Sequence, residues 1–281
     1  MLHERQMKFR QRTSEIVIWA LLIVIALLEV FPIYWAVMSS FKPESEILAQ
    51  SYTPYPVHPT LMQYVKIFQQ QPFGRFIFNT FVVSAGATLL ALITSATSGY
   101  IFAKFHFPLR NFLFLIVLGT IMIPIQVYAI PLFLFVQKLG LINTLPGIMI
   151  PGIIMSTGIF FMKQNMEMIP NELIDAARID GCSEYRIFLT VIVPLSRAPI
   201  IAISIISFTV MWNDLFWPLM IAQTRENYTA NLGLMLFQRV YITDYGAQMA
   251  GAVVVLLVPL LLFLFLRRYI LEGFALSGLK G

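Results

Sequence analysis

Apolar residues of this chain are concentrated in six long runs, which polar segments separate. The runs cover residues 16–38, 76–102, 112–136, 145–162, 200–221 and 249–266. Each run is close to the roughly 20 residues that a helix needs to cross about 30 Å of hydrocarbon. The third and fourth runs contain Pro124, Pro131, Pro146 and Pro151, which membrane helices tolerate where neighbouring groups satisfy the freed backbone. The pattern predicts an all-α fold, a polytopic membrane bundle with six transmembrane helices.

Composition supports a membrane protein. Of the 281 residues, 58% are hydrophobic and 12% are charged, whereas soluble domains carry about 25% charged residues. The first run follows a basic N-terminus and is longer than the apolar part of a signal peptide, so we expect a retained first span. The single cysteine, Cys182, excludes an intrachain disulfide.

The distribution of positive charge predicts the orientation. An even number of spans places both termini on one side. With the termini inside, the inner segments hold thirteen Lys and Arg residues and the outer segments hold six, so the positive-inside rule predicts cytoplasmic termini. No linker divides the chain, and we expect one membrane domain over residues 1–281 with a cytoplasmic tail over about 267–281. The first outer loop, residues 41–75, contains five prolines and is expected to be extended.

The polar segment between the fourth and fifth runs, about residues 163–197, is predicted to form a helix, a glycine turn and a second helix on the inner side. Pro170 suits the first turn of a helix, and Gly181 can end it in a left-handed conformation. Ser183 can cap the second helix, which should stop near Pro194. The apolar stripe of the first helix is formed by Ile169, Leu173, Ala176 and Ala177.

Two interpretations of this helix–turn–helix segment are open from its residues alone. Asp175 and Arg178 lie three positions apart and can pair on an exposed face. The segment is either a docking surface for a soluble partner or an amphipathic hairpin that lies on the membrane surface.

The segment resembles the EAA loop of ABC importer membrane subunits. That loop reads Glu-Ala-Ala, three residues, Gly, nine residues, Ile-x-Leu-Pro. Here Asp175-Ala176-Ala177 is followed at the same spacing by Gly181 and by Val191-Ile192-Val193-Pro194. The departures, Asp for Glu and Val for Ile and Leu, keep the chemistry of each position.

Shorter motifs extend the resemblance to MalG-like subunits of sugar importers over nearly the whole chain. They occur in the family's order and are Phe31-Pro32-Ile33-Tyr34-Trp35, Ser40-Phe41-Lys42-Pro43, Phe78-Asn79-Thr80, Phe107-Pro108-Leu109-Arg110, Trp212-Asn213-Asp214, Trp217-Pro218-Leu219 and Gly278-Leu279-Lys280-Gly281.

The resemblance implies a permease subunit of a carbohydrate importer, with an oligosaccharide as the expected substrate, in the cytoplasmic membrane of a bacterium or archaeon. It implies four partners: a second homologous permease subunit, a cytoplasmic ATPase dimer, an extracytoplasmic solute-binding protein and the sugar. ATP-driven closure of the ATPase would move the loop and switch the bundle between inward- and outward-facing states. The residues expected to couple to the ATPase are Glu172, Asp175, Ala176, Ala177, Arg178, Asp180, Gly181 and Pro194.

The chain is expected to have no catalytic activity of its own. It contains no GxxxxGK[ST] phosphate-binding loop, so ATP and Mg belong to the partner ATPase, and this chain is expected to bind no cofactor and no metal.

Five residues are candidates for the substrate path: Asn79, Trp212, Asn213, Asp214 and Trp217. Acidic residues inside a membrane are costly, and they are usually buried against a partner or a water-filled path. Asn213 and Asp214 could accept and donate hydrogen bonds to sugar hydroxyls, and a tryptophan could stack on the sugar ring. The alternative is a polar bridge between helices that fixes their packing.

Other functions compete with the importer. Glycerol-phosphate importers share the architecture, but a phosphate favours Arg or Lys in the path, and the six apolar runs contain neither. An ion-coupled secondary transporter would need paired broken helices and coupling acids. A membrane enzyme would need clustered acids or histidines. The sequence shows neither arrangement, and a passive scaffold stays open.

Overall fold

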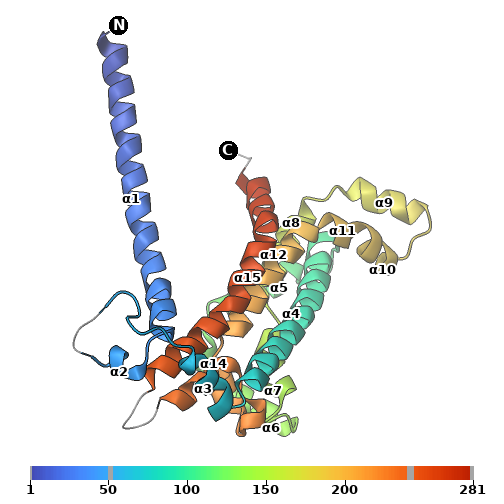
Figure 1. The fold of residues 1–281 in the computed structure, drawn as a ribbon. Coiled ribbons are helices and arrows are strands. Elements are labelled where there is room, and N and C mark those ends of the chain that lie inside the picture. Colours follow the sequence, from blue (N-terminus) through green and yellow to red (C-terminus); the bar gives the residue numbers. More distant parts are fainter. Residues whose placement is uncertain (1, 50–52, 239–243, 279–281) are drawn as a thin grey trace. The chain divides into compact units, whose positions relative to one another are not determined.

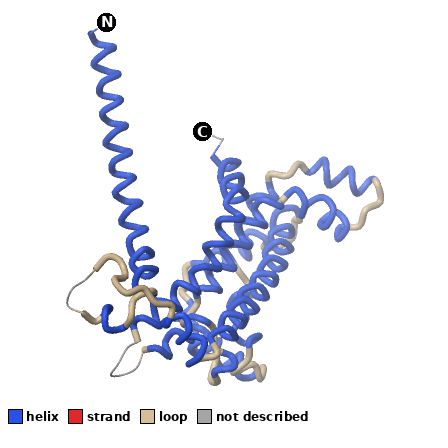
Figure 2. Tube along the Cα trace, in the orientation of Figure 1, coloured by secondary structure: helices blue, strands red, loops and turns tan. Residues whose placement is uncertain are grey.

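Regular secondary structure in this chain is helical, as the hydrophobic pattern predicts (Figure 1, Figure 2). The computed structural model describes residues 2–49, 53–238 and 244–278, and it describes side chains over residues 15–49, 53–238 and 244–265. Within these ranges there is no β-strand, so the all-α prediction is confirmed.

The helices fall into two compact units. Unit 1 comprises Met1–Gln71 and Leu236–Leu256, and unit 2 comprises Pro72–Met235 and Leu257–Gly281. The single membrane domain over residues 1–281 stays a prediction.

Unit 1 is held together by polar side chains at the start of its last helix. Its helices are α1 (Leu2–Ser40), α2 (Glu44–Ile47), α3 (Met62–Gln70) and the first part of α15 (Tyr245–Gly278), with η4 (Met235–Phe237) at its boundary. The Glu44 carboxylate accepts hydrogen bonds from the backbone N–H groups of Tyr245 and Gly246 at 3.1 and 2.9 Å. A negative charge at this end of α15 is favoured by the helix dipole.

The first outer loop is not extended throughout, because α2 and α3 lie within it. Its irregular part is ordered by Glu46, whose carboxylate accepts hydrogen bonds from the backbone N–H groups of Val57 and His58 at 2.9 and 3.2 Å. These bonds, the one from Val57 first, hold the pKa of Glu46 below its ordinary value. The prolines of this loop did not predict that the Glu46 carboxylate would organise it.

Unit 2 is organised around one long helix, α4 (Phe73–Lys104), against which α8 and α12 pack most extensively. The other helices of the unit are α5 (Arg110–Ile121), α6 (Ile125–Lys138), α7 (Leu145–Met149), η1 (Ile150–Gly152), α8 (Ser156–Glu167), α9 (Asn171–Ile179), α10 (Glu184–Ile187), η2 (Phe188–Ile192), α11 (Val193–Leu195), α12 (Arg197–Asn213), α13 (Phe216–Ile221), η3 (Arg225–Asn227) and α14 (Ala230–Leu234). Small residues bring α4 and α8 close together. A Cβ on Gly99 would lie 2.5 Å from the Cβ of Met162. Such close approach is typical of membrane helix pairs, in which van der Waals packing supplies much of the attraction.

Three of the predicted spans correspond to single helices, and three further candidate spans are pairs of helices joined at a sharp bend. The single helices are Glu15–Ser40, Phe73–Lys104 and Tyr245–Phe265. The bent pairs are Arg110–Ile121 with Ile125–Lys138 (103°), Leu145–Gly152 with Ser156–Glu167 (48°) and Glu184–Leu195 with Arg197–Asn213 (79°). The described residues therefore contain three helices that could cross a membrane, or up to six if each bent pair is one span. The count of six stays a prediction.

The fifth apolar run is interrupted where the sequence predicted one helix over residues 200–221. The helix α12 ends at Asn213, and α13 begins at Phe216. The Asp214 carboxylate accepts hydrogen bonds from the N–H groups of Phe216 and Trp217, at 3.0 and 3.4 Å. A side chain that bonds the backbone two and three residues ahead favours the start of a new helix over continuation of the old one.

Candidate functional site

The helix–turn–helix predicted between the fourth and fifth apolar runs is present in unit 2. The helix α9 begins directly after Pro170 and ends at Ile179. Gly181 then adopts a φ of +78°, a left-handed conformation that glycine accepts without steric cost. The Ser183 hydroxyl caps α10 by accepting a hydrogen bond from the N–H of Arg186 at 3.4 Å. We name residues 170–195 the projecting segment, because α9 and α10 extend away from the ends of α4 and α8 (Figure 1).

The buried face of α9 differs from the predicted stripe. Ile169 and Ile174 are buried, and Ala177 is half-buried against the same cluster. Leu173 and Ala176, which the stripe included, are exposed. Periodicity could not decide between the adjacent apolar residues Leu173 and Ile174, because either one continues a helical pattern.

Ionic and polar contacts join the projecting segment to the end of α4. Arg178 donates to Asp175 at 2.9 Å and to Glu184 at 2.7 Å, so the predicted Asp175–Arg178 pair is present. The hydrogen bond to Glu184 is the main cause that raises the pKa of Arg178. Glu184 also accepts a hydrogen bond from the Tyr100 hydroxyl at 3.0 Å, and Lys104 donates to the Asn171 side chain at 2.9 Å. The segment is therefore tied to α4 on both sides of its turn.

The second half of the segment ends close to the predicted position. Residues Phe188–Ile192 form a π-helix, and α11 continues through Pro194 to Leu195. Pro194 has no N–H to donate to the preceding turn, and π-turns are a usual response to a local break in the α-helical hydrogen-bond pattern. The chain bends by 79° before α12, at a proline and a π-helix, which are two recognised causes of sharp kinks.

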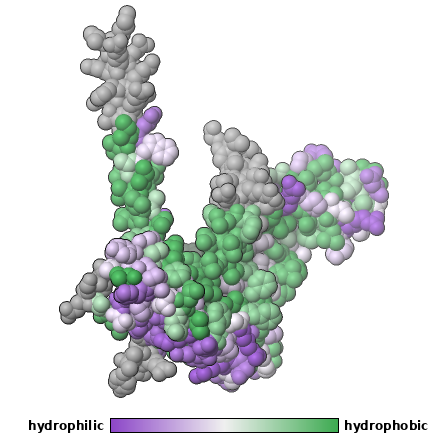
Figure 3. Space-filling view, viewed as in Figure 1, coloured by the Kyte–Doolittle hydropathy of each residue, from purple (hydrophilic) through white to green (hydrophobic). Residues whose placement is uncertain are grey.

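Most of the predicted coupling residues are accessible. Seven of the eight are exposed, namely Glu172, Asp175, Ala176, Arg178, Asp180, Gly181 and Pro194, and Ala177 is half-buried. Sequence reasoning missed Ile179, whose side chain is 86% exposed at the end of α9. The sequence contained a signal for this residue, because Ile179 is an apolar residue that lies outside the predicted apolar stripe of a short helix. Figure 3 shows hydrophilic patches interspersed with hydrophobic residues on the projecting segment, whereas the surface of the helices beneath it is mostly apolar.

The charge of this surface is negative. Within α9 and the turn, the exposed carboxylates are those of Glu172, Asp175 and Asp180, and Arg178 is the one cation of that stretch. Helices that lie on membranes are rich in Lys and Arg on their polar face. An acidic face with an exposed isoleucine at its end suits a protein partner better than a lipid surface.

Three of the five candidate path residues lie in the packed interior of unit 2. Trp212 and Trp217 are fully buried, and Asn79 is nearly so. The Trp217 indole donates to the carbonyl of Gly147 at 3.0 Å. The Asn79 amide donates to the carbonyls of Glu226 and Tyr228 at 2.7 and 2.9 Å. These side chains hold helices and the segment around residues 226–228 in place, as the packing alternative expects.

The other two candidates lie at the break between α12 and α13. Asn213 is exposed and donates to the carbonyl of Thr209 at 3.0 Å, whereas one carboxylate oxygen of Asp214 caps α13. The structure therefore does not gather the five residues on one surface, and their role in the path stays a prediction.

Two substitutions separate a capping role of Asp214 from a transport role. Asp214→Asn keeps an oxygen that accepts both N–H groups, so we expect unchanged stability and unchanged sugar transport. Asp214→Ala removes the acceptor and should lower the stability by about 1 kcal/mol. Thermal unfolding of the purified complex and sugar uptake into proteoliposomes measure the two effects. A weaker sugar affinity of a stable Asp214→Asn variant would place the carboxylate in the path.

The described residues contain no group of three His, Cys, Asp or Glu side chains that could hold a metal ion.

The helical architecture matches that of ABC importer permeases. A solved structure of a bacterial ABC transporter involved in the import of the acidic polysaccharide alginate aligns with a TM-score of 0.80, covering 92% of this chain and 96% of that one at 21% identity. At this identity the likeness concerns the fold.

Sequence comparison defines the family. A model of the family described as binding-protein-dependent transport system inner membrane component matches residues 95–274, and the chain belongs to this family. A relative from Halalkalibacterium halodurans, the arabinooligosaccharides transport system permease protein AraQ, is 34% identical over 97% of this chain and 100% of its own length. The sn-glycerol-3-phosphate transport system permease protein UgpE of Yersinia enterocolitica is 29% identical over 94% of this chain and 96% of its own. The chain is thus a multi-pass membrane permease component of the sugar ABC importer family.

Proposed function

We propose that this chain is one of two permease subunits of a binding-protein-dependent importer for a carbohydrate, and that the projecting segment couples it to a separate ATPase. The observation that carries the proposal is the exposed, acidic face of α9, with Ile179 86% exposed at its end and with both sides of the turn tied to α4. A firmly anchored helix that leaves an isoleucine uncovered is suited to insertion into a groove of a partner.

The partners follow from this arrangement. The chain has no phosphate-binding loop, so the ATPase is another polypeptide and carries ATP and Mg. An acidic α9 favours a groove with basic residues, since opposite charges steer association and fix register. A second permease subunit and an extracytoplasmic binding protein complete the importer, and the positive-inside rule places the projecting segment and both termini in the cytoplasm.

The carbohydrate class rests on the relatives and on the charge of the spans. The relative AraQ is named for arabinooligosaccharides and UgpE for sn-glycerol-3-phosphate. Recognition of a phosphate favours Arg or Lys, and the six apolar runs contain neither. An oligosaccharide therefore suits this subunit better than a phosphorylated polyol.

The test is a substitution that changes the docking surface without touching the fold. Ile179→Asp adds a charge at an exposed position, so the unfolding temperature should stay the same while the cognate ATPase is lost from the purified complex. Leu61→Asp, at an exposed leucine of unit 1, is the matched control and should retain the ATPase. The measurement is the ratio of ATPase to permease after affinity purification through the permease. Full retention of the ATPase by Ile179→Asp would contradict the proposal.

A further inference from the structure

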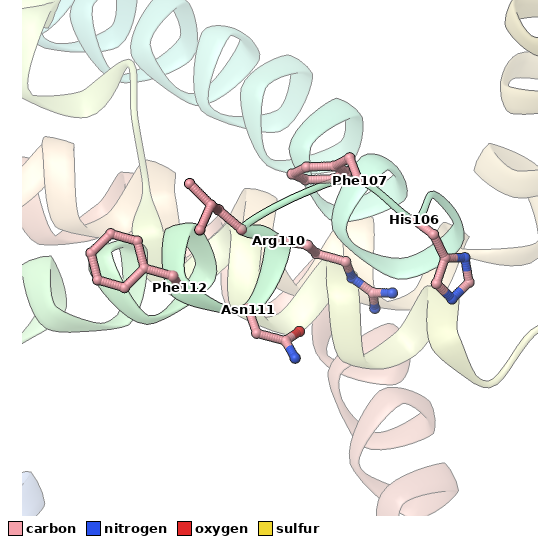
Figure 4. Close-up of a pocket in the computed structure, with 6 residues that line it drawn as sticks. His106, Phe107, Arg110, Asn111 and Phe112 are labelled. Atoms are coloured by element: carbon pink, nitrogen blue, oxygen red, sulfur yellow. The ribbon is translucent and has the colours of Figure 1, made fainter.

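A pocket of about 380 Å³ lies over the loop that joins α4 to α5 (Figure 4). Its lining residues are His106, Phe107, Leu109, Arg110, Asn111 and Phe112. The helix α4 is a candidate span that ends at Lys104, and α5 opens a second candidate span at Arg110. A short loop between two apolar helices is located where the hydrocarbon meets water, so the pocket faces the headgroup region of the bilayer.

Arg110 has unused hydrogen-bonding capacity. Its Nη2 lies 3.3 Å from the Glu167 carboxylate, longer than the roughly 2.7–2.9 Å of a strong charge-assisted bond. Its Nε is buried without a hydrogen-bond partner among the described residues. A guanidinium offers five N–H donors in a fixed plane, and a buried donor without an acceptor is costly. The Arg110 guanidinium can therefore donate to an additional hydrogen-bond acceptor.

The surroundings of Arg110 carry a positive charge. Arg110 and Lys163 share one carboxylate, that of Glu167, at 3.3 and 2.6 Å, so this group of three has a net charge of +1. The Arg110 guanidinium and the His106 ring extend to the same side of the loop, and the Asn111 carboxamide lies below them (Figure 4). Asn111 and His106 are exposed and can add donors to an anion in the pocket.

The rim of the pocket is apolar and turned outward. Leu109 is 70% exposed and Phe112 is 58% exposed. Leu109 also has a φ of +61°, a left-handed conformation that costs a residue other than glycine about 1–2 kcal/mol. In water, an exposed leucine side chain at such a turn makes no contact that would offset this conformational cost. Among lipid chains its side chain contributes favourable contact, so the rim matches the amphipathic character of a phospholipid.

We propose that this pocket binds the phosphate of an anionic phospholipid headgroup, with Arg110 as the principal donor, Asn111 and His106 as additional contacts, and Leu109 and Phe112 against the acyl chains. Basic pockets between membrane helices are a known form of headgroup recognition. Arg110 suits this role because its planar donors match the oxygens of a phosphate. The proposal does not depend on the transported substrate.

The test uses the full-length chain in neutral detergent, mixed with phosphatidylglycerol or phosphatidylcholine, with bound lipid counted by native mass spectrometry. We expect preferential retention of phosphatidylglycerol. Arg110→Gln should weaken this binding about fivefold, which is the contribution of one interfacial cation. Arg225→Gln, at an exposed arginine of η3, is the matched control and should bind phosphatidylglycerol as the unchanged chain does.

Two further arms keep the test decisive. Asn111→Leu leaves the Arg110–Glu167 pair intact and should also weaken phosphatidylglycerol binding, so a fold defect of Arg110→Gln cannot account for both losses. Inorganic phosphate at millimolar concentration should fail to displace the lipid. Equal retention of the two lipids, wild-type retention by Arg110→Gln and Asn111→Leu, or displacement by free phosphate would each overturn the proposal.

Discussion

Gly181→Pro is expected to lower the ATP hydrolysis that a loaded binding protein stimulates by about 5- to 150-fold, the range of typical coupling energies. Proline fixes φ near −65°, whereas Gly181 has a φ of +78° and its N–H donates to the carbonyl of Arg178 at 3.0 Å. The substitution therefore removes both the conformation and the hydrogen bond that reverse the chain after α9. The measurement is the hydrolysis rate of the reconstituted complex with and without sugar-loaded binding protein.

Gly140 offers a control with the same local chemistry. It has a φ of +69°, its N–H donates to the carbonyl of Gln137 at 2.9 Å, and no atom lies within 4 Å of an added Cβ. Gly140→Pro should lose a comparable amount of stability, because it also removes a left-handed backbone conformation and a backbone hydrogen bond. It should keep the stimulation by the binding protein. Equal losses of stimulation in both variants would show that the turn at Gly181 has no particular role in coupling.

Gly99→Val is expected to destabilise unit 2 by forcing two of its closely packed helices apart. The new Cβ would lie 2.5 Å from the Cβ of Met162 and 3.0 Å from the backbone nitrogen of Lys163, so α4 and α8 must separate. Overpacking of a well-packed interior costs about 1–3 kcal/mol, and occasionally more. Thermal unfolding of the purified permease and the yield of monodisperse protein measure this loss.

The matched control is Gly119→Val, in the last turn of α5, where nothing lies within 4 Å of an added Cβ. It makes the same change of side chain within a helix but meets no neighbour. We expect its unfolding temperature to stay near that of the unchanged chain. Similar destabilisation by both substitutions would assign the effect to helix propensity rather than to the close approach of α4 and α8.

The long helices were predictable because hydrophobic length alone defines them. The helices α1, α4 and α15 each contain an apolar run that the sequence identified. The bends were only partly predictable. Prolines pointed to the third and fourth spans, but the break between α12 and α13 depends on the bonds of the Asp214 carboxylate to backbone N–H groups, which a hydrophobicity pattern does not contain.

The projecting segment was predictable from local signals, and the burial of the two candidate tryptophans was not. Gly181 and Ser183 act on their immediate neighbours, so spacing along the chain was sufficient to place the turn and the second cap. Trp212 and Trp217 looked like sugar-stacking residues, but they are fully buried in the structure. Whether an aromatic ring faces a path or a neighbouring helix depends on contacts between distant segments, such as the bond from Trp217 to Gly147.

The length of α4 would allow a movement at one of its ends to reach the other. Its 32 residues correspond to about 48 Å of helix. At one end Tyr100 bonds Glu184 of the projecting segment, and near the other end Asn79 bonds the backbone of Glu226 and Tyr228. A tilt of about 10° around its midpoint would carry each end roughly 4 Å in opposite directions. If α4 moves as a rigid body, a displacement of the projecting segment at one end would thus displace the segment around residues 226–228 at the other end.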